Sequence, residues 1–600
     1  PKDIPDSVSE ASGAAAKASS VVASERGKLV TVKEYPPEKD ITGEEPRIGV
    51  FVCHCGINIG GVVDVPGVVE YAKTLPNVAY AENNLYTCSQ DTQKKIREKI
   101  EENNLNRVIV ASCTPRTHQP LFQNTCAEAG LNPYLFEMAN IRDQCSWVHM
   151  HKPEKATQKA KDLVRMVVAK SGLLEPLKRV PIEVKPSGLV IGGGLSGMTA
   201  AQELSKQGYE AFIVERDHEL GGLMRRIHYE MIGEKKDIQK RLKEMVKNIE
   251  SDEKIHVHKN SHVKDISGYI GNFKTVIDHE GNDKEIEHGI IIVATGGEEY
   301  KPKEYLYGKN DKVLTQLEFE KMLARAKKLD SDTIVMIQCV GSRDDERPYC
   351  SRVCCTEAVK NALKVKELNP DANVYVLFKD IRTYGFSEVF YEEAARKGVK
   401  FIRYDDETKP KVDDKKGLEV RIQEPFLGEE IAIKPDLLVL SSATIPHPDN
   451  GDLAQMLKVP LSKHKFFLEA HMKLRPVEFA TEGIFLCGLA HSPKFFEECV
   501  SQASAAVSRA STILSKKTLE SEGMVSTIDE NICSGCGTCV VICPFNAIEK
   551  DENGIARVTE VLCKGCGTCA SSCPEKAASL KQFTDEQLIA QVVAAVKEVL

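Results

Sequence analysis

The chain has 600 residues, of which 42% are apolar, 28% are charged and 20 are cysteine, and its formal net charge is −8. This composition excludes a chain that is disordered throughout, the acidic balance argues against nucleic-acid binding, and no apolar run is long enough for a membrane span. Because the chain is long and its start has no apolar signal core, we expect a cytoplasmic protein whose thiols are metal ligands or redox groups rather than disulfides.

Residues 1–45 are rich in Ala, Ser, Lys, Glu and Pro, and this composition predicts a loose, extended arm. The pattern changes at residue 46. Short apolar runs such as 48–52 and 107–112 alternate with helical stretches as far as residue 180. Strands and helices that alternate at these lengths are typical of a small α/β domain. We therefore expect an N-terminal α/β domain over residues 46–180.

Cysteines follow the strands of this N-terminal domain. Cys53 and Cys55 come at the end of one strand, Cys113 comes at the end of another, and Cys88 lies between them in sequence. Because the carboxyl ends of parallel strands meet at one edge of a sheet, these four thiols can gather to bind a [4Fe–4S] cluster. In the alternative, only one thiol of the Cys-x-Cys pair is a ligand.

A glycine-rich turn opens the next domain, which is predicted over residues 181–325. Gly192, Gly194 and Gly197 follow a buried strand and precede a helix, and Glu215 ends the second strand about twenty residues later. In such a turn the glycines let a pyrophosphate approach the backbone, the helix N-terminus stabilises its charge, and the acid binds ribose hydroxyls. The turn predicts bound FAD, with a nicotinamide dinucleotide as the alternative ligand.

Further features favour FAD. A Gly-Gly pair follows the acid, an apolar strand ends in Ala-Thr-Gly, and a glycine precedes a late helix of small residues, as in flavoproteins of the two-dinucleotide-binding class. The late helix lies in residues 466–518, which we assign to a second part of the FAD domain. The additional FAD-binding candidates are Gly221, Gly222, Thr295, Gly296 and Gly488.

Another α/β domain is predicted to be inserted in the FAD domain, over residues 326–465. Flavoproteins of this class carry a second glycine fingerprint there, but Gly341 stands alone after the strand 334–338. Without that fingerprint the pyrophosphate turn cannot be built in the usual way, so direct reduction by NAD(P)H is in doubt.

Four cysteines follow the same strand of the inserted domain. Their spacing matches no ferredoxin pattern but places four thiols within seventeen residues, which predicts an atypical iron–sulfur cluster. The alternative is a set of buried thiols with a redox disulfide. The predicted ligands are Cys339, Cys350, Cys354 and Cys355.

The strongest motif is a repeat in a domain predicted over residues 519–582. The run Cys-x2-Cys-x2-Cys-x3-Cys-Pro occurs twice, and it is typical of proteins with two [4Fe–4S] clusters, in which the fourth cysteine of each run binds the other cluster. A structural zinc site, the alternative, pairs cysteines and does not use this run. The predicted ligands are Cys533, Cys536, Cys539 and Cys573 for one cluster and Cys563, Cys566, Cys569 and Cys543 for the other.

Residues 583–600 are predicted to form a C-terminal helix that begins at a capping box. One face of this helix is apolar, and it can pack on the core of this chain or dock on a partner. The residues of that face are Leu588, Val592, Val596 and Val599.

In combination these motifs resemble HdrA, the iron–sulfur flavoprotein component of heterodisulfide reductases. The resemblance covers about residues 46–580. It rests on Cys-His-Cys-Gly-Ile-Asn-Ile-Gly-Gly-Val-Val-Asp-Val from Cys53, Val-Ala-Ser-Cys-Thr-Pro-Arg from Val110, the Gly192 fingerprint, Gln-Cys-Val-Gly-Ser-Arg-Asp from Gln338, and the twin cysteine runs. One departure is that no cysteine lies near 222–226, where some members carry a cysteine-rich insert, so we expect no additional clusters there.

The resemblance implies a multidomain α/β protein. It has an N-terminal iron–sulfur domain, a FAD domain of the two-dinucleotide-binding type with an inserted thioredoxin-reductase-like domain, and a C-terminal 2[4Fe–4S] ferredoxin domain. The resemblance also implies an oxidoreductase subunit with one FAD and about four clusters, in which an electron pair is divided between a disulfide-type acceptor and ferredoxin. The implied partners are the disulfide-reducing B and C subunits, ferredoxin, and a donor such as a hydrogenase, a formate dehydrogenase or an NADH-linked module, in a dimer of heteromers.

Two other functions stay open from the sequence. The chain could be an electron-relay scaffold that does not divide electron pairs, or a flavin disulfide reductase of the thioredoxin reductase type. The lone Gly341 and the absence of a Cys-x2-Cys dithiol in the inserted domain argue against the reductase. Ferredoxin reduction that depends on the disulfide acceptor would separate pair division from simple relay.

Overall fold

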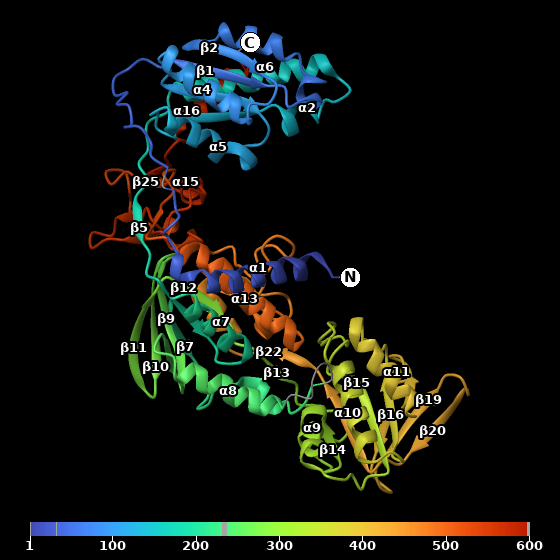
Figure 1. Cartoon of the computed structure of the whole chain (residues 1–600). Helices are drawn as coiled ribbons and strands as arrows, with labels where there is room; N and C mark the ends of the chain where they lie inside the picture. The colour runs from blue at the N-terminus through green and yellow to red at the C-terminus, as the bar shows by residue number, and fades with distance from the viewer. Residues whose placement is uncertain (1, 32, 231–236, 597–600) are drawn as a thin grey trace. The chain divides into compact units, whose positions relative to one another are not determined.

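The computed structural model describes residues 2–31, 33–230 and 237–596. The chain divides into two compact units, coloured by residue number in Figure 1. One unit comprises Pro1–Leu29 and Glu183–Leu519, and the other comprises Val30–Ile182 and Glu520–Leu600. None of the helices in the described ranges has the length and apolarity that a bilayer crossing requires.

The N-terminal domain is built on a four-stranded parallel sheet in the order β2-β1-β3-β4. Its strands are β1 (Ile48–Cys53), β2 (Val78–Asn84), β3 (Arg107–Ser112) and β4 (Phe136–Asn140). The central strands β1 and β3 are buried along their whole length, which explains their continuous apolar runs. Helices α3 (Val65–Lys73) and α6 (Pro153–Ser171) pack on one face, and α4 (Gln90–Glu102) and α5 (Pro115–Glu128) pack on the other.

The same unit contains the ferredoxin-like domain, in which two short antiparallel pairs frame two short helices. β25 (Ser526–Ile528) pairs with β28 (Ala578–Leu580), and β26 (Ile548–Lys550) pairs with β27 (Ala556–Val558). The helices α14 (Thr538–Ile542) and α15 (Thr568–Ser572) each begin just before the third cysteine of a run. Because β25 and β28 come from opposite ends of the domain, their pairing brings the end of the second run beside the first.

The C-terminal helix α16 (Asp585–Val596) packs on α6, but with a different face from the predicted apolar one. Gln587 and Ala594 are its buried residues, and Arg165 donates a hydrogen bond to the Ala594 carbonyl at 2.7 Å. Leu588, Val592 and Val596 are 41–62% exposed. Val599 lies outside the described residues. Polar contacts, rather than the apolar face, therefore attach this helix to α6.

The other unit holds the dinucleotide domain, whose parallel sheet has the order β23-β12-β6-β7-β8. Its strands are β6 (Ser187–Ile191), β7 (Glu210–Val214), β8 (Ile255–His258), β12 (Ile290–Val293) and β23 (Ile484–Leu486). Helices α7 (Leu195–Lys206) and α13 (Phe496–Leu514) cover one face. Since β23 is almost two hundred residues away from β12, its neighbour in the sheet, a whole domain must be inserted between them.

The inserted domain has its own five-stranded parallel sheet in the order β14-β21-β15-β16-β17. Its strands are β14 (Val313–Thr315), β15 (Thr333–Val340), β16 (Asn373–Phe378), β17 (Lys400–Arg403) and β21 (Leu437–Ser442). Helix α10 (Cys354–Leu368) follows the loop after β15. The antiparallel pair of β13 (Gly297–Glu299) and β22 (Thr444–Pro446) joins this domain to the dinucleotide domain.

The predicted bounds of 326–465 for the inserted domain differ from the structure at both ends. β14 pairs with β21, and the helix α9 (Gln316–Arg325) packs in the inserted core, although both precede residue 326. At the other end, α12 (Asn450–Leu457) packs against the dinucleotide sheet. A three-residue edge strand such as β14 has no periodicity of its own, so only its pairing reveals where the domain begins.

The predicted extended arm over residues 1–45 is wrong for its first half, which forms the helix α1 (Ile4–Val21). The helix packs along α13, with Gly13 close to the Ser501 carbonyl and Lys17 paired with Glu203. The Asp3 side chain caps its N-terminus by accepting from the Asp6 amide. Alanine-rich sequence has high helix propensity, and packing on α13 is what makes the helix stable.

Candidate redox sites

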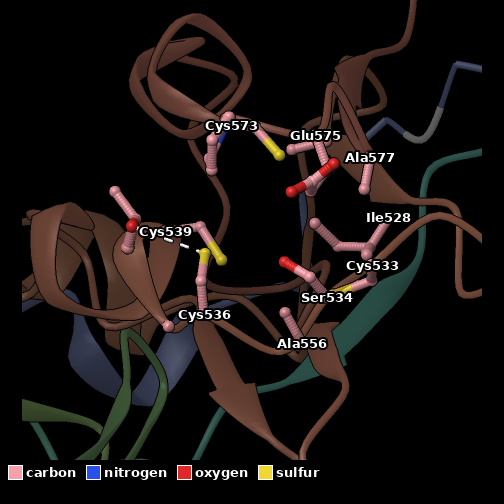
Figure 2. Close-up of a pocket in the computed structure, with 13 residues that line it drawn as sticks. Ile528, Cys533, Ser534, Cys536, Cys539, Ala556, Cys573, Glu575 and Ala577 are labelled. Carbon is pink, nitrogen blue, oxygen red and sulfur yellow. Dashed lines mark hydrogen bonds between the residues drawn. The ribbon is translucent and has the colours of Figure 1, made fainter.

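Four cysteines surround one cavity of the ferredoxin-like domain (Figure 2). Cys533, Cys536 and Cys539 come from the first run and Cys573 comes from the end of the second. The pairing of β25 with β28, in which Ile528 faces Ala578, places Cys573 at this cavity. The structure therefore brings together the four thiols that the crossed pattern predicts.

Three of the other four cysteines of the runs are linked by contacts. Cys563 accepts a hydrogen bond from the Ser526 amide at 3.3 Å, and the Ser526 hydroxyl lies 3.2 Å from the Cys569 sulfur. Cys543 accepts from the Ala547 amide at 3.3 Å and packs with Cys563 in one buried group. Backbone N–H groups aimed at sulfur stabilise thiolate ligands and tune the potential of a cluster.

In the described parts of the chain, no three His, Cys, Asp or Glu side chains converge closely enough to hold a single metal ion. A zinc site needs four ligands around one ion. In a cubane cluster each iron takes one thiolate, so the sulfur atoms stand around a larger body. The four cysteines around the cavity in Figure 2 supply the four thiolates that a cubane cluster takes.

The N-terminal domain gathers its four predicted cysteines at the carboxyl edge of its sheet. The Cys53 sulfur accepts hydrogen bonds from the amides of Cys55 and Thr87, each at 3.3 Å. Burial raises the pKa of the loop residue Cys88, and the neighbouring thiolates of Cys53, Cys113 and Cys55 raise it further. Because β1 lies between β2 and β3 in the sheet, the ends of these strands and the segments after them, which carry the four cysteines, meet at one edge.

Arg142 is a residue of this site that the sequence did not indicate. Its guanidinium lies 3.7 Å from the Cys55 sulfur, and its charge also acts on Cys113. The short helical turn Arg142–Ser146 that carries it follows β4 and resembles no ligand motif. A cation beside thiolates offsets the negative charge that a bound cluster adds.

Two further cysteines of the N-terminal domain lie outside this site. Cys126 is fully buried on α5 in the apolar core, and burial raises its pKa. Cys145 is also buried, its sulfur is 3.1 Å from the Ala156 carbonyl, and burial raises its pKa to about 11. Both are core thiols rather than members of the four-cysteine group.

The inserted domain brings its four predicted cysteines together at the end of β15 and the start of α10. Cys339 interacts electrostatically with Cys355 and Cys350, and Cys350 accepts from the Arg352 amide at 3.3 Å. The hydrogen bond from Cys354 lowers the pKa of the Cys355 thiol, and Arg382 and Arg343 lower it further, against the opposing effect of burial. The thiols thus lie together in cationic surroundings.

The dinucleotide domain contains a cavity of about 830 Å³ beside its glycine-rich turn. A Cβ at Gly192 would collide with the Ala294 carbonyl, and a Cβ at Gly197 would collide with the Gly192 carbonyl. Glu215 accepts hydrogen bonds from the Gly193 amide at 2.6 Å and the Asp217 amide at 2.9 Å. A cradle that admits no side chains, next to a buried acid, fits a dinucleotide. The predicted residues that line this cavity are Gly192, Gly194, Glu215, Gly222, Thr295 and Gly296.

The other predicted FAD residues, Gly197, Gly221 and Gly488, lie behind the wall of the cavity and shape it. The Gly221 amide donates to the Gly193 carbonyl at 2.9 Å, which attaches the Gly-Gly segment to the turn. The Gly488 amide donates to the Gln502 side chain at 2.9 Å, and a Cβ there would collide with Ser196. These glycines permit close backbone packing.

A second, larger cavity of about 1190 Å³ shares part of its wall with the first. It extends to the start of α10, where Arg352, Val353, Thr356 and Glu357 line it on both sides of the Cys354–Cys355 pair. No sequence motif indicated this second cavity, because its lining comes from α1, the dinucleotide domain and the inserted domain. The shared wall consists of Leu223, Ile227, Glu298, Glu299, Leu489, Lys494 and Phe496.

Comparison with known proteins identifies the same two modules. The model of the pyridine nucleotide-disulphide oxidoreductase family matches residues 179–337, and that of the 4Fe-4S dicluster domain matches residues 526–580. The second iron-sulfur A-subunit of the CoB–CoM heterodisulfide reductase of Methanopyrus kandleri is 38% identical over 84% of this chain and 91% of its own length. The chain belongs to the HdrA family of heterodisulfide reductases.

Another member of the family covers still more of the chain. The A-subunit of the H(2):CoB-CoM heterodisulfide,ferredoxin reductase of Methanothermobacter thermautotrophicus is 37% identical over 94% of this chain and 99% of its own. A solved thioredoxin reductase from Lactococcus lactis is similar over 55% of this chain and 98% of its own, with 19% identity and a TM-score of 0.40.

Membership of the HdrA family confirms several predictions from the sequence. The chain is an oxidoreductase subunit that binds FAD and [4Fe–4S] clusters. Its predicted fold class, a dinucleotide-binding flavoprotein with a C-terminal twin-cluster domain, is also confirmed.

The lone Gly341 in the inserted domain has a φ of +71°, and a Cβ there would collide with the Tyr300 ring, so this glycine serves a local packing role.

Proposed function

We propose that this chain divides electron pairs at its FAD between a disulfide-type acceptor and ferredoxin. The observation that carries the proposal is the wall that the dinucleotide cavity shares with the second cavity. The second cavity extends to the residues on either side of Cys354 and Cys355 in the inserted domain. FAD exchanges two electrons together or one at a time, whereas a cluster exchanges only one. A flavin bound beside a cluster is therefore suited to splitting a pair.

We assign four cysteines to each of four [4Fe–4S] clusters. Hydrogen bonds from backbone amides to Cys53, Cys350, Cys543 and Cys563 support the assignment, since such bonds stabilise thiolates. The proposed ligand sets are Cys53, Cys55, Cys88 and Cys113; Cys339, Cys350, Cys354 and Cys355; Cys533, Cys536, Cys539 and Cys573; and Cys563, Cys566, Cys569 and Cys543.

The residues around each site set its potential. Arg343 and Arg382 lie beside the inserted-domain cysteines, and their charge favours the reduced, more negative state of a cluster there. Arg142 has the same role beside Cys55. Cluster potentials span about −700 to +450 mV depending on charge, hydrogen bonding and exposure, so one chain can hold both a downhill and an uphill route.

The partners follow from this function. We propose a cytoplasmic dimer of heteromers in which the B and C subunits reduce the disulfide and ferredoxin takes the low-potential electron. The name of the Methanothermobacter relative includes hydrogen, the CoB–CoM heterodisulfide and ferredoxin. For this chain the proposed donor is a hydrogenase, a formate dehydrogenase or an NADH-linked module.

The test is a coupled assay on the assembled complex under anaerobic conditions. We expect ferredoxin reduction only when the disulfide acceptor is also present, with one electron delivered to each route. Reduction of ferredoxin without the second acceptor would contradict pair division and leave a relay scaffold or a plain dehydrogenase.

The cofactor content gives a second test. We expect about sixteen irons and one FAD per chain in anaerobically purified protein, from four clusters of four irons. A content near eight irons would restrict the clusters to the ferredoxin-like domain and remove the cluster that the proposed electron division requires beside the flavin.

A further inference from the structure

Lys494 is the one charged residue of the shared cavity wall for which the described residues provide no ion-pair partner. The other two charged residues of that wall are paired, since Glu298 lies 3.2 Å from Arg216 and Glu299 lies 3.2 Å from Lys301. The Lys494 ammonium donates a hydrogen bond to the Ser492 hydroxyl at 3.0 Å. No described carboxylate stands within ion-pair distance of it.

The surroundings of Lys494 make an unpaired charge costly. Burial lowers the pKa of Lys494, and the Arg352 cation lowers it further, whereas Glu498 and Asp6 act in the opposite direction from beyond ion-pair distance. Glu498 is itself engaged by Arg352 through contacts of 3.1 and 2.6 Å. A partly desolvated ammonium without a counter-ion is stabilised by a negative group from a ligand in the cavity.

The position of Lys494 indicates which part of a dinucleotide it faces. Gly192, Gly194 and Glu215, which recognise pyrophosphate and ribose in this fold, line the first cavity only. Lys494 lies in the wall that both cavities share, beside Leu489 and Phe496. A wall of apolar side chains in which Lys494 is, among the described residues, the one unpaired charge suits a flat ring with one electron-rich edge better than it suits a phosphate.

We propose that Lys494 lies against the electron-rich edge of the bound flavin ring and stabilises the negative charge that the ring gains on reduction. The inference rests on the proposed function in that it requires FAD to bind in this cavity. It adds that this chain raises the potential of its flavin through one lysine on the loop before α13. A cation held near developing charge in a low-dielectric site acts more strongly than it does in water.

The test compares three variants of the full chain in its complex. Lys494→Met removes the charge but keeps much of the side-chain length, Lys494→Arg keeps the charge, and Lys473→Met removes a charge from an exposed lysine of the same domain. The readouts are the midpoint potential of the bound FAD in an anaerobic titration at several pH values, and the dissociation constant for FAD.

We expect Lys494→Met to weaken binding of reduced relative to oxidised FAD about tenfold, which lowers the two-electron potential by ~30 mV. The potential should also depend more steeply on pH in this variant, because the reduced ring then takes up a proton in place of the lost cation. Lys494→Arg should restore most of the potential, and Lys473→Met should leave it unchanged.

Two outcomes would overturn the inference. FAD that binds more weakly to Lys494→Met with no change in potential would place the lysine against the pyrophosphate or assign it a structural role. An equal shift in Lys473→Met would show a general charge effect. A wild-type chain that bound no FAD would instead refute the proposed function, so the two failures are distinguishable.

Discussion

The ferredoxin-like domain and the inserted domain each gather four cysteines, but they build the surrounding loops from different residues. In the ferredoxin-like domain, the left-handed residues between the first three cysteines of each run are glycines, with φ values of +69° at Gly535 and +81° at Gly537. At the end of β15 in the inserted domain and in the loop after it, left-handed conformations fall on Cys339, Arg343 and Arg352 as well as on Gly341, with φ values of +62°, +57°, +61° and +71°. Glycine adopts this conformation freely, whereas in other residues it costs of order 1–3 kcal/mol each.

The difference shows two ways to specify a four-thiol site. Where glycines carry the turn, the loop can form locally, and the cysteine spacing alone reveals the ligands. Where Cys and Arg adopt the left-handed conformation, the surrounding fold must hold them there, so the spacing is irregular. Cys55 of the N-terminal site, with a φ of +46°, belongs to the second kind. Strained residues of this sort concentrate at functional sites.

The largest expected effect tests the crossed ligation of the ferredoxin-like domain. Cys573→Ala should lose about four irons and destabilise this small domain, since metal binding contributes folding free energy there. Combining it with Cys533→Ala should cost no further iron, because both residues belong to one cluster. Combining Cys533→Ala with Cys543→Ala should cost about eight. Iron and sulfide analysis of the purified variants checks this, and the opposite pattern would mean that each run binds its own cluster.

The N-terminal site allows the same iron-content test on a site whose ligands come from separate segments brought together by the tertiary structure. Cys113→Ala should lose about four irons while the domain stays folded. Cys126→Ala is the matched control, because it removes another buried thiol of the same domain and should keep all the iron. Iron analysis with circular dichroism measures both. Equal iron contents in the two variants would mean that Cys113 is not a cluster ligand and that the N-terminal domain binds no cluster through it.

Substitutions in the glycine-rich turn of the dinucleotide domain test whether a short local motif is also sufficient to specify FAD binding. Gly197→Ala should abolish FAD binding, because the added Cβ collides with the Gly192 carbonyl. Gly194→Ala should also weaken FAD binding but leave the turn intact, because the Cβ position is open in the protein and its φ of −74° suits alanine, whereas a Cβ on this cavity-lining residue takes space that the pyrophosphate needs. FAD content by absorbance after release decides the matter. A Gly194→Ala variant that kept its full FAD content would mean that the pyrophosphate does not approach the backbone at this glycine.

The smallest expected effect is a pH dependence of the stability of the dinucleotide domain, caused by the buried His288. Burial of His288, which bonds to Thr275 at 2.8 Å, lowers its pKa to about 4 from an ordinary 6.5. The unfolded chain therefore binds the extra proton first, and the stability present above pH 6.5 is lost as the pH falls toward 4, by about 3 kcal/mol at most. Urea unfolding at several pH values, monitored by the release of the flavin, should show this loss of stability. The His288→Gln variant should lose less stability over the same pH range. An unchanged pH dependence in the variant would assign it to other groups.

Sequence reasoning reached much of the fold because its signals were local. The strand Arg107–Ser112 was predicted with its observed bounds, since it is a continuous buried run. The bounds of the inserted domain were missed, because β14 has only three residues and is defined by its pairing with β21. The helix α1 was missed because composition alone does not show that α13 provides a surface for it. Lys494 and Arg142 were missed because neither belongs to a motif.

The sequence by itself determined the twin cysteine runs, the glycine turn around Gly192 and the family, since these depend on spacing within one loop and on residue types that only certain backbones accept. The tertiary structure decided which distant segments meet: Cys573 beside Cys533, Cys88 beside Cys53, and Lys494 between two cavities. The physical reason is range. A loop a few residues long constrains its own geometry, whereas contacts between distant segments form only when the packing of whole sheets and helices offsets the entropy lost on closing the chain between them.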